Sequence, residues 1–334
     1  MSEVYRIFGS ELSPYSVKVR SYFRYKGLAH EWLLRSPANQ SEFQKYAKLP
    51  LVPLVVTPQS EGIQDSTPII ERFESASPSL TPDDPVLAFL SALIEEYGDE
   101  WGNKWMFHYR WTYAPDTWAT AERIGQQMMG AQGTLAVAQA RAAVAERMTG
   151  RLGFVGSNAA TRPLIEASFK RALEILEAHL ANRPYVLGGR PAMADFGLWG
   201  QFYEAATDPT PGAIMRASAP KVMAWVQRMV SPKVEGAFDS WASLSADLMP
   251  LLTEEVGGLF LPWSVANAAA IARGDKTFSM TLAGARWSQE PQKYHARSLQ
   301  EIQRKYANAK DAAGLDGILE AAGCLSALRS GASA

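Results

Sequence analysis

The chain has little cysteine, no long apolar run and almost no net charge. Its 334 residues include a single cysteine, Cys324, so no intrachain disulfide, dithiol redox pair or cysteine-based zinc site can form. No stretch reaches the roughly 18 consecutive apolar residues of a transmembrane helix. Lys and Arg number 33 against 34 Asp and Glu, which gives a formal net charge of -1. This balance favours neither nucleic acid nor an acidic membrane as a partner.

Several chemical signatures are also missing. The chain has no Gly-rich phosphate loop and no serine nucleophile elbow. Its four histidines are His30, His108, His179 and His295. They show no metal-ligand spacing, so we expect no metal site. The first residues lack the basic and apolar segments of a signal peptide. Together with the single cysteine, this predicts a cytoplasmic protein.

Residues 1–80 alternate short apolar runs with helical patterns, which predicts a small α/β domain. The expected strands are 5–8, 31–34, 54–57 and 63–64, and the expected helices are 14–26, 41–47 and 67–75. A segment rich in Ser, Pro, Thr and Asp follows at 77–85. Such turn residues indicate a linker at the end of this domain.

Helical patterns dominate residues 86–250 and predict an all-helical second domain. An aromatic-rich helical segment, 86–118, opens it and is followed by helix formers over 121–148. Residues 251–334 differ, with an alternating strand-like run at 277–282 and helices after Pro291 and over 315–328. We expect this C-terminal extension to pack on the helical domain.

Ser13 and Pro14 stand between the first expected strand and the first expected helix. A hydroxyl before a proline at the first helical position suits an anion, because free N–H groups and the helix dipole point there. Ser is also a preferred helix cap, so this pair alone is more typical of a structural N-cap.

Two further segments carry polar or backbone signals. Pro53 stands directly before an apolar strand, where a cis bond would expose the neighbouring backbone to a ligand and a trans bond would be ordinary. Asp65 and Ser66 precede the third expected helix, and taken alone they are typical helix caps.

In this order and spacing, these segments resemble the glutathione transferase superfamily over about residues 4–245. Ser13-Pro14-Tyr15-Ser16 falls where omega- and beta-type members carry Cys-Pro-x-Ala, so Ser13 takes the place of that cysteine. Gly189 to Phe196 resembles the segment that opens a core helix in the family, with Asp195 in a structural role. The resemblance implies a thioredoxin-like N-terminal domain followed by a helical C-terminal domain.

The resemblance also assigns roles to the residues. Val52 and Pro53 correspond to the cis-proline segment that pairs with the cysteinyl part of glutathione, and Asp65 and Ser66 correspond to the pair that holds its γ-glutamyl end. Glutathione is therefore the expected co-substrate. The family also implies a homodimer.

Two departures from the family pattern affect these roles. Leu51 replaces the polar residue that usually stands two positions before the proline, so one side-chain contact to glutathione is missing. Ala192 replaces the usual Ser or Thr three residues before Asp195, which leaves only the Asp half of the reciprocal cap. Residues after about 251 lie outside the family plan, where they can cover the cleft or a dimer surface.

The implied mechanism stabilises the glutathione thiolate, which then attacks an electrophilic carbon. Ser13 is the expected hydrogen-bond donor to the sulfur, with Ser16 as the substitute candidate. We expect the electrophile to bind between the domains, against a wall of aromatic and polar residues: Tyr15, Trp105, His108, Tyr109 and Trp111. The alternative for these aromatics is a place in the hydrophobic core.

Three functions fit the sequence. The first is a glutathione transferase that acts on a small hydrophobic electrophile. The second is a glutathione-dependent lyase that cleaves ethers or removes halogen. The third is a non-catalytic relative that binds glutathione or a hydrophobic ligand, an alternative that Leu51 and the extension leave open. Thiol–disulfide reduction is disfavoured because a serine forms no mixed disulfide.

Overall fold

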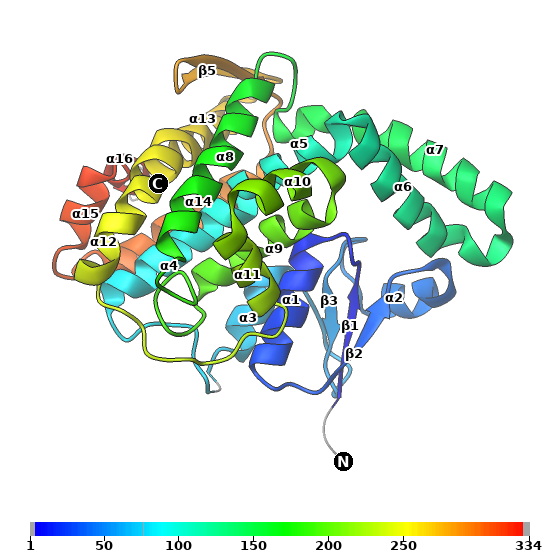
Figure 1. The fold of residues 1–334 in the computed structure, drawn as a ribbon, viewed down its shortest axis with the longest axis horizontal. Coiled ribbons are helices and arrows are strands. Elements are labelled where there is room, and N and C mark those ends of the chain that lie inside the picture. The colour runs from blue at the N-terminus through cyan, green and yellow to red at the C-terminus, as the bar shows by residue number, and fades with distance from the viewer. Residues whose placement is uncertain (1–3, 76, 330–334) are drawn as a thin grey trace.

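A small mixed sheet flanked by helices forms the N-terminal part of the computed structural model, which describes residues 4–75 and 77–329 (Figure 1). Its elements are β1 (Tyr5–Gly9), α1 (Pro14–Tyr25), β2 (His30–Leu34), α2 (Gln40–Tyr46), β3 (Leu54–Val56), β4 (Gly62–Gln64) and α3 (Ser66–Phe73). The strand order is β2-β1-β3-β4. Strand β1 pairs in parallel with β2 and antiparallel with β3. This confirms the thioredoxin-like unit expected from the sequence.

Alternation along the strands places helices on both faces of the sheet. Ile7 and Val55 face the large core that contains α1 and α3. Phe8 and Leu54 point to the other face and pack with Phe43 of α2. Side chains alternate between faces along a strand, so two apolar residues in succession give β1 a buried surface on each side.

The second part is helical, as the sequence predicts. It consists of α4 (Pro85–Tyr97), η2 (Gly98–Gly102), α5 (Asn103–Thr112), α6 (Ala114–Met129), η3 (Gly130–Gln132), α7 (Thr134–Thr149), η4 (Leu152–Val155), α8 (Arg162–His179), α9 (Met193–Thr207), α10 (Pro209–Ser218) and α11 (Pro220–Arg228). Helices α6 and α7 form a hairpin that projects on the right of Figure 1.

The aromatic-rich segment is not one straight helix. A π-helical turn, η2, separates α4 from α5, and the chain turns again at Tyr113, whose backbone is extended. Pro115 lies in the first turn of α6. Because proline has no N–H to donate, it cannot continue the hydrogen bonds of α5.

The C-terminal extension packs on the helical part and shares its core. It comprises α12 (Trp241–Pro250), η5 (Leu251–Phe260), α13 (Leu261–Arg273), β5 (Phe278–Leu282), β6 (Ala285–Gln289), α14 (Lys293–Ala309), α15 (Leu315–Ala321) and α16 (Leu325–Arg329). Trp263 and Ile302 belong to the same buried cluster as Leu90 of α4. The expected strand at 277–282 has a partner, β6, that the sequence pattern did not indicate.

The expected limit at residue 251 falls inside a continuous helical segment, because α12, η5 and α13 follow one another without a break. The limits 1–80, 86–250 and 251–334 stay predictions.

Asp195 stabilises the start of α9 by accepting hydrogen bonds from the backbone N–H of Ala192 and Val186, both at 2.9 Å. Burial raises the pKa of Asp195 to about 6.

A buried lysine joins the sheet domain to the helical part. The Lys18 Nζ of α1 lies 2.6 Å from both Glu95 Oε1 and Asp99 Oδ2, and 3.2 Å from Thr67 Oγ1. Lys18 and Glu95 are fully buried. One ammonium between two carboxylates lowers the pKa of Glu95, whereas burial raises the pKa of Asp99.

In the described part of the chain, no helix is both long and apolar enough to span a bilayer.

Candidate functional site

A pocket of about 720 Å³ lies where the sheet domain, the helical part and the extension meet. The sheet domain contributes Tyr15, Val52, Pro53, Asp65 and Ser66. The helical part contributes Glu100, Asn103, Phe107, Met148, Arg151 and Phe154, and the extension contributes Gln292, Tyr294, His295 and Arg297. Five of the residues predicted from the sequence therefore line one cavity.

The loop before β3 presents Val52 and Pro53 to this pocket. The Val52–Pro53 peptide bond is cis, as the resemblance implies. The Gln64 side chain fixes the loop, because its Nε2 donates to the carbonyl oxygens of Leu49 and Leu51 at 2.9 and 2.8 Å. Val52 precedes the paired residues of β3. Its backbone thus lies at the pocket wall and outside the sheet ladder.

Asp65 and Ser66 lie at the N-terminus of α3. Asp65 has φ 77°, a conformation that costs a non-glycine residue about 1–3 kcal/mol and is common at ligand sites. Its side chain makes no capping bond to α3 and instead accepts a hydrogen bond from Tyr294 Oη at 3.0 Å. Burial raises the pKa of Asp65, while Tyr294 and Lys18 oppose that rise. The Ser66 hydroxyl is buried and has no hydrogen-bond partner among the described residues.

Three hydroxyl-bearing residues at the N-terminus of α1, Ser13, Tyr15 and Ser16, have different surroundings. Ser13 is the N-cap, half-buried, and its Oγ accepts from the Ser16 N–H at 3.3 Å. Ser13 is not among the residues that line the pocket. The Ser16 hydroxyl is buried without a partner in the described residues. Tyr15 lines the pocket and donates to the Asp99 carbonyl oxygen at 3.0 Å. Burial and the nearby carboxylate of Glu100 raise the Tyr15 pKa well above its ordinary value.

Four of the predicted wall residues lie elsewhere. Trp105, His108, Tyr109 and Trp111 are all buried and none of them lines the pocket. Trp105 Nε1 donates to Ser168 Oγ at 2.9 Å, within the core of the helical part. His108 contacts Ser157 Oγ at 2.7 Å, and burial lowers its pKa. Two residues of α5 do line the pocket, Asn103 and Phe107, and neither was among the wall residues named from the sequence.

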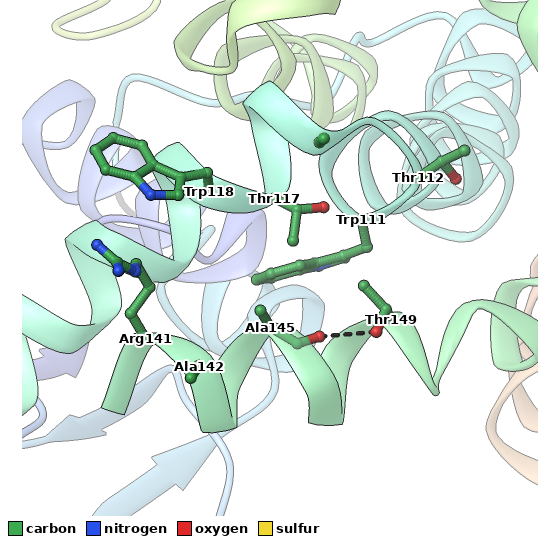
Figure 2. A pocket seen from close by; sticks show the side chains of 9 residues that line it. Trp111, Thr112, Thr117, Trp118, Arg141, Ala142, Ala145 and Thr149 are labelled. Atoms are coloured by element: carbon green, nitrogen blue, oxygen red, sulfur yellow. Dashed lines mark hydrogen bonds between the residues drawn. The ribbon is translucent and has the colours of Figure 1, made fainter. Parts of the chain in front are cut away.

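Trp111 lines a second, smaller pocket of about 360 Å³ between α5, α6 and α7. Figure 2 shows its indole between Thr117 and Ala145, with Thr149 on α7 donating to the Ala145 carbonyl oxygen at 2.9 Å. This pocket has no lining residue in common with the larger one. The structure therefore does not bring Trp111 together with Val52, Asp65 or Ser66.

The extension forms a wall of the pocket, as expected for a segment that covers the cleft, although none of its residues was named from the sequence. Tyr294, His295 and Arg297 lie in the first turns of α14. His295 Nδ1 contacts Glu100 Oε2, and Ser298 Oγ donates to Glu100 Oε1 at 3.1 Å. The sequence signal for α14 was its amphipathic pattern after Pro291, which predicts a helix but not where it packs. Among residues 4–75 and 77–329, no cluster of His, Cys, Asp and Glu is suited to a metal ion.

Structural comparison finds similar folds at low sequence identity. A glutathione S-transferase from Methylobacterium radiotolerans, in complex with glutathione sulfonate, is 18% identical, with 71% of this chain and 97% of that chain covered and a TM-score of 0.43. The beta-etherase LigF from Sphingobium sp. strain SYK-6 is 19% identical, with 69% and 95% covered and a TM-score of 0.45. A glutathione S-transferase from Methylobacillus flagellatus with glutathione bound is 16% identical, with 73% and 98% covered and a TM-score of 0.41. A search of curated proteins found no match.

Family profiles match both parts of the chain. The N-terminal domain of glutathione S-transferase matches residues 7–82, and the C-terminal domain of glutathione S-transferase matches residues 138–228. The two matches together cover half of the sequence. They include Ser13, Pro53, Asp65 and Asp195, on which the resemblance rests. The chain belongs to the glutathione S-transferase superfamily.

Proposed function

We propose that this protein conjugates glutathione to a small hydrophobic electrophile. The observation that carries the proposal is the convergence of Val52, Pro53, Asp65 and Ser66 on one pocket of about 720 Å³. These residues come from two separate segments of the sheet domain, and the resemblance assigns both segments to glutathione. The pocket is of ordinary size for a small-molecule site.

The binding mode follows from the chemistry of the wall. The Asp65 carboxylate suits the γ-glutamyl ammonium, and the unpartnered hydroxyl of Ser66, at the N-terminus of α3, suits the γ-glutamyl carboxylate. The backbone of Val52 suits the cysteinyl part. In this orientation the thiol extends toward the start of α1, where Ser13 is the N-cap.

Ser13 stabilises the thiolate in this proposal. A serine hydroxyl has one donor and two acceptor positions, so Ser13 Oγ can accept from the Ser16 N–H and still donate to sulfur. A charge-assisted hydrogen bond is worth about 1.5–3 kcal/mol and the helix dipole about 0.3–1 kcal/mol. Together they can lower a thiol pKa by about two units, which takes ~2.7 kcal/mol.

The reaction is a nucleophilic substitution or addition at carbon. The sulfur lone pair forms the new S–C bond. In substitution the leaving group departs with the bonding electrons, and in addition the π-electron pair moves to the neighbouring atom, which takes up a proton from water. Phe107, Met148 and Phe154 form an apolar part of the same pocket. That wall is our candidate site for the electrophile.

The homodimer implied by the resemblance stays a prediction, which the solution mass of the purified protein would test.

The proposal is tested by calorimetric titration with glutathione and by turnover of an activated aryl chloride. We expect wild-type protein to bind glutathione and to form the thioether. Ser13→Ala should reduce kcat about 10–100-fold, the equivalent of one charge-assisted hydrogen bond, and change the glutathione Kd less than about twofold.

Ser16→Ala and Ser10→Ala are the comparison variants. Ser16 is the substitute candidate, whereas Ser10 lies in the same loop and its Oγ accepts from the Leu12 N–H at 3.2 Å. Loss of turnover in Ser16→Ala with normal turnover in Ser13→Ala would reassign the role to Ser16. Absence of glutathione binding would reject both enzymatic functions, and binding without turnover over a panel of electrophiles would favour a non-catalytic relative.

A further inference from the structure

Helix α14 of the C-terminal extension is fixed against the glutathione-type segments by contacts at both ends. At its start, Tyr294 Oη donates to Asp65 Oδ2 at 3.0 Å. Farther along, Lys305 Nζ lies 2.7 Å from Glu71 Oε1 of α3. Tyr294 and Asp65 are separated by 229 positions in the sequence. Helix α14 therefore contacts α3 at Glu71 and brings Tyr294 to Asp65, the residue that precedes α3.

The contact is made at an unusual backbone position. Asp65 has a positive φ and its carboxylate makes no capping bond to α3. Asp65 and Tyr294 both line the pocket, and the Asp65 carboxylate accepts the hydrogen bond of Tyr294 there. Tyr294 is 53% exposed, so packing alone does not account for its position.

The charges around Asp65 explain why a hydrogen-bond donor is needed there. Glu100 of η2 lines the same pocket and disfavours a negative charge on Asp65. Lys18 of α1 provides the opposing positive charge, but it already contacts Glu95 and Asp99. Tyr294 supplies a neutral donor to Asp65 without adding a cation that would compete with an incoming ammonium group.

We propose that Tyr294 is a positioning residue of the glutathione site, which holds the Asp65 carboxylate where it receives the γ-glutamyl ammonium. The extension thus completes the γ-glutamyl end of the pocket. This inference rests on the proposed function. It concerns one end of the ligand only, because in the proposed binding mode the cysteinyl part lies at Val52 and not at Asp65.

Tyr294→Phe removes the hydroxyl and keeps the ring. Its matched control is Tyr306→Phe, on the same helix, where the hydroxyl donates to Asp316 Oδ1 at 2.7 Å, outside the pocket. The probes are S-hexylglutathione and S-hexylcysteinylglycine, which lacks the γ-glutamyl group. The affinities of both probes are measured by calorimetry for wild type, Tyr294→Phe and Tyr306→Phe. The same measurements are made for the single variant Asp65→Asn and the double variant Asp65→Asn/Tyr294→Phe.

We expect Tyr294→Phe to weaken the affinity for S-hexylglutathione about 5–20-fold, as for loss of a hydrogen bond to a charged group. The affinity for S-hexylcysteinylglycine should stay within twofold of wild type. The control should change neither affinity, and Tyr294→Phe should have no further effect in the Asp65→Asn background. An unchanged affinity, or an equal loss for both probes, would overturn the role of Tyr294. If wild type binds neither probe, the proposed function fails as well, whereas normal binding with an unaffected Tyr294→Phe overturns this inference alone.

Discussion

The two sides of the pocket differ in how far apart their residues lie in the sequence. The side from the sheet domain takes Val52, Pro53, Asp65 and Ser66 from two neighbouring segments. The opposite side takes Phe107 from α5 and Tyr294 from the extension, which the fold brings together from distant parts of the chain. The first side depends on local backbone geometry and the second on long-range packing. Variants on the two sides should therefore fail in different ways.

The largest expected effect comes from Lys18, which joins the two sides. Lys18→Met leaves Glu95 and Asp99 buried without their ammonium partner, and breaking a buried ion pair typically costs about 3–5 kcal/mol. Urea unfolding should show that loss. Lys45→Met, at an exposed position on α2, should stay within about 0.5 kcal/mol of wild type. A loss below about 1 kcal/mol in Lys18→Met would mean that packing alone holds the two sides together.

On the side of the sheet domain, Asp65→Ala should weaken glutathione binding about 10–100-fold, because it removes a charge-assisted contact. The free energy of unfolding should fall much less than in Lys18→Met. Glu61→Ala is the matched control, since Glu61 lines the same pocket but is exposed. Its Oε2 lies 3.4 Å from the Nη2 of Arg72. Equal losses of glutathione affinity in both variants would indicate a general charge effect and contradict a specific role for Asp65.

On the opposite side, Phe107→Ala should reduce kcat/KM for an apolar electrophile about tenfold. Removing a half-buried phenyl ring forfeits about 1.4 kcal/mol of apolar contact with the substrate. The glutathione Kd should not change. Trp118→Ala alters the other pocket, where the ring is exposed (Figure 2), and should leave both constants unchanged. If Trp118→Ala has the larger effect on turnover, the electrophile binds in the smaller pocket.

The smallest expected effect is a shift in pH dependence. Burial raises the pKa of Asp65, so the ionised form is lost on acidification at a higher pH than for an ordinary aspartate. Glutathione affinity should fall as the pH decreases through that raised value. Tyr294→Phe removes a hydrogen bond that lowers the pKa, so the fall should begin at a still higher pH. Asp65→Asn should abolish this dependence, and its persistence would assign it to another group.

The fold and the sheet-domain side of the pocket could be predicted because their signals are local. The strand before Ser13, the proline before β3 and the polar pair before α3 each lie within a few residues of the structure they determine. In the sheet domain the helix boundaries moved by one or two residues, which is ordinary for fraying ends, whereas the expected helical segments 86–118, 121–148 and 315–328 are each divided into shorter helices. Ser13 was correctly expected at a helix N-terminus, and its chemical role stays a prediction.

The opposite side could not be predicted because burial on α5 depends on distant elements. The extension covers the preceding turn, so that Trp101 packs against Trp263 and Trp287, and both flanks of the aromatic segment are buried. A helix enclosed in this way shows no single apolar face. Aromatic content alone therefore could not separate Phe107, which reaches the pocket, from Trp105, which lies in the core.

The most direct test of the central claim is the thiol pKa of bound glutathione, followed by ultraviolet absorption of the thiolate across a pH titration. The account predicts that the bound thiol titrates about two units below the ordinary thiol value of about 8.5 in wild type, and near that value in Ser13→Ala. A bound thiol with the same pKa in both proteins would contradict the account.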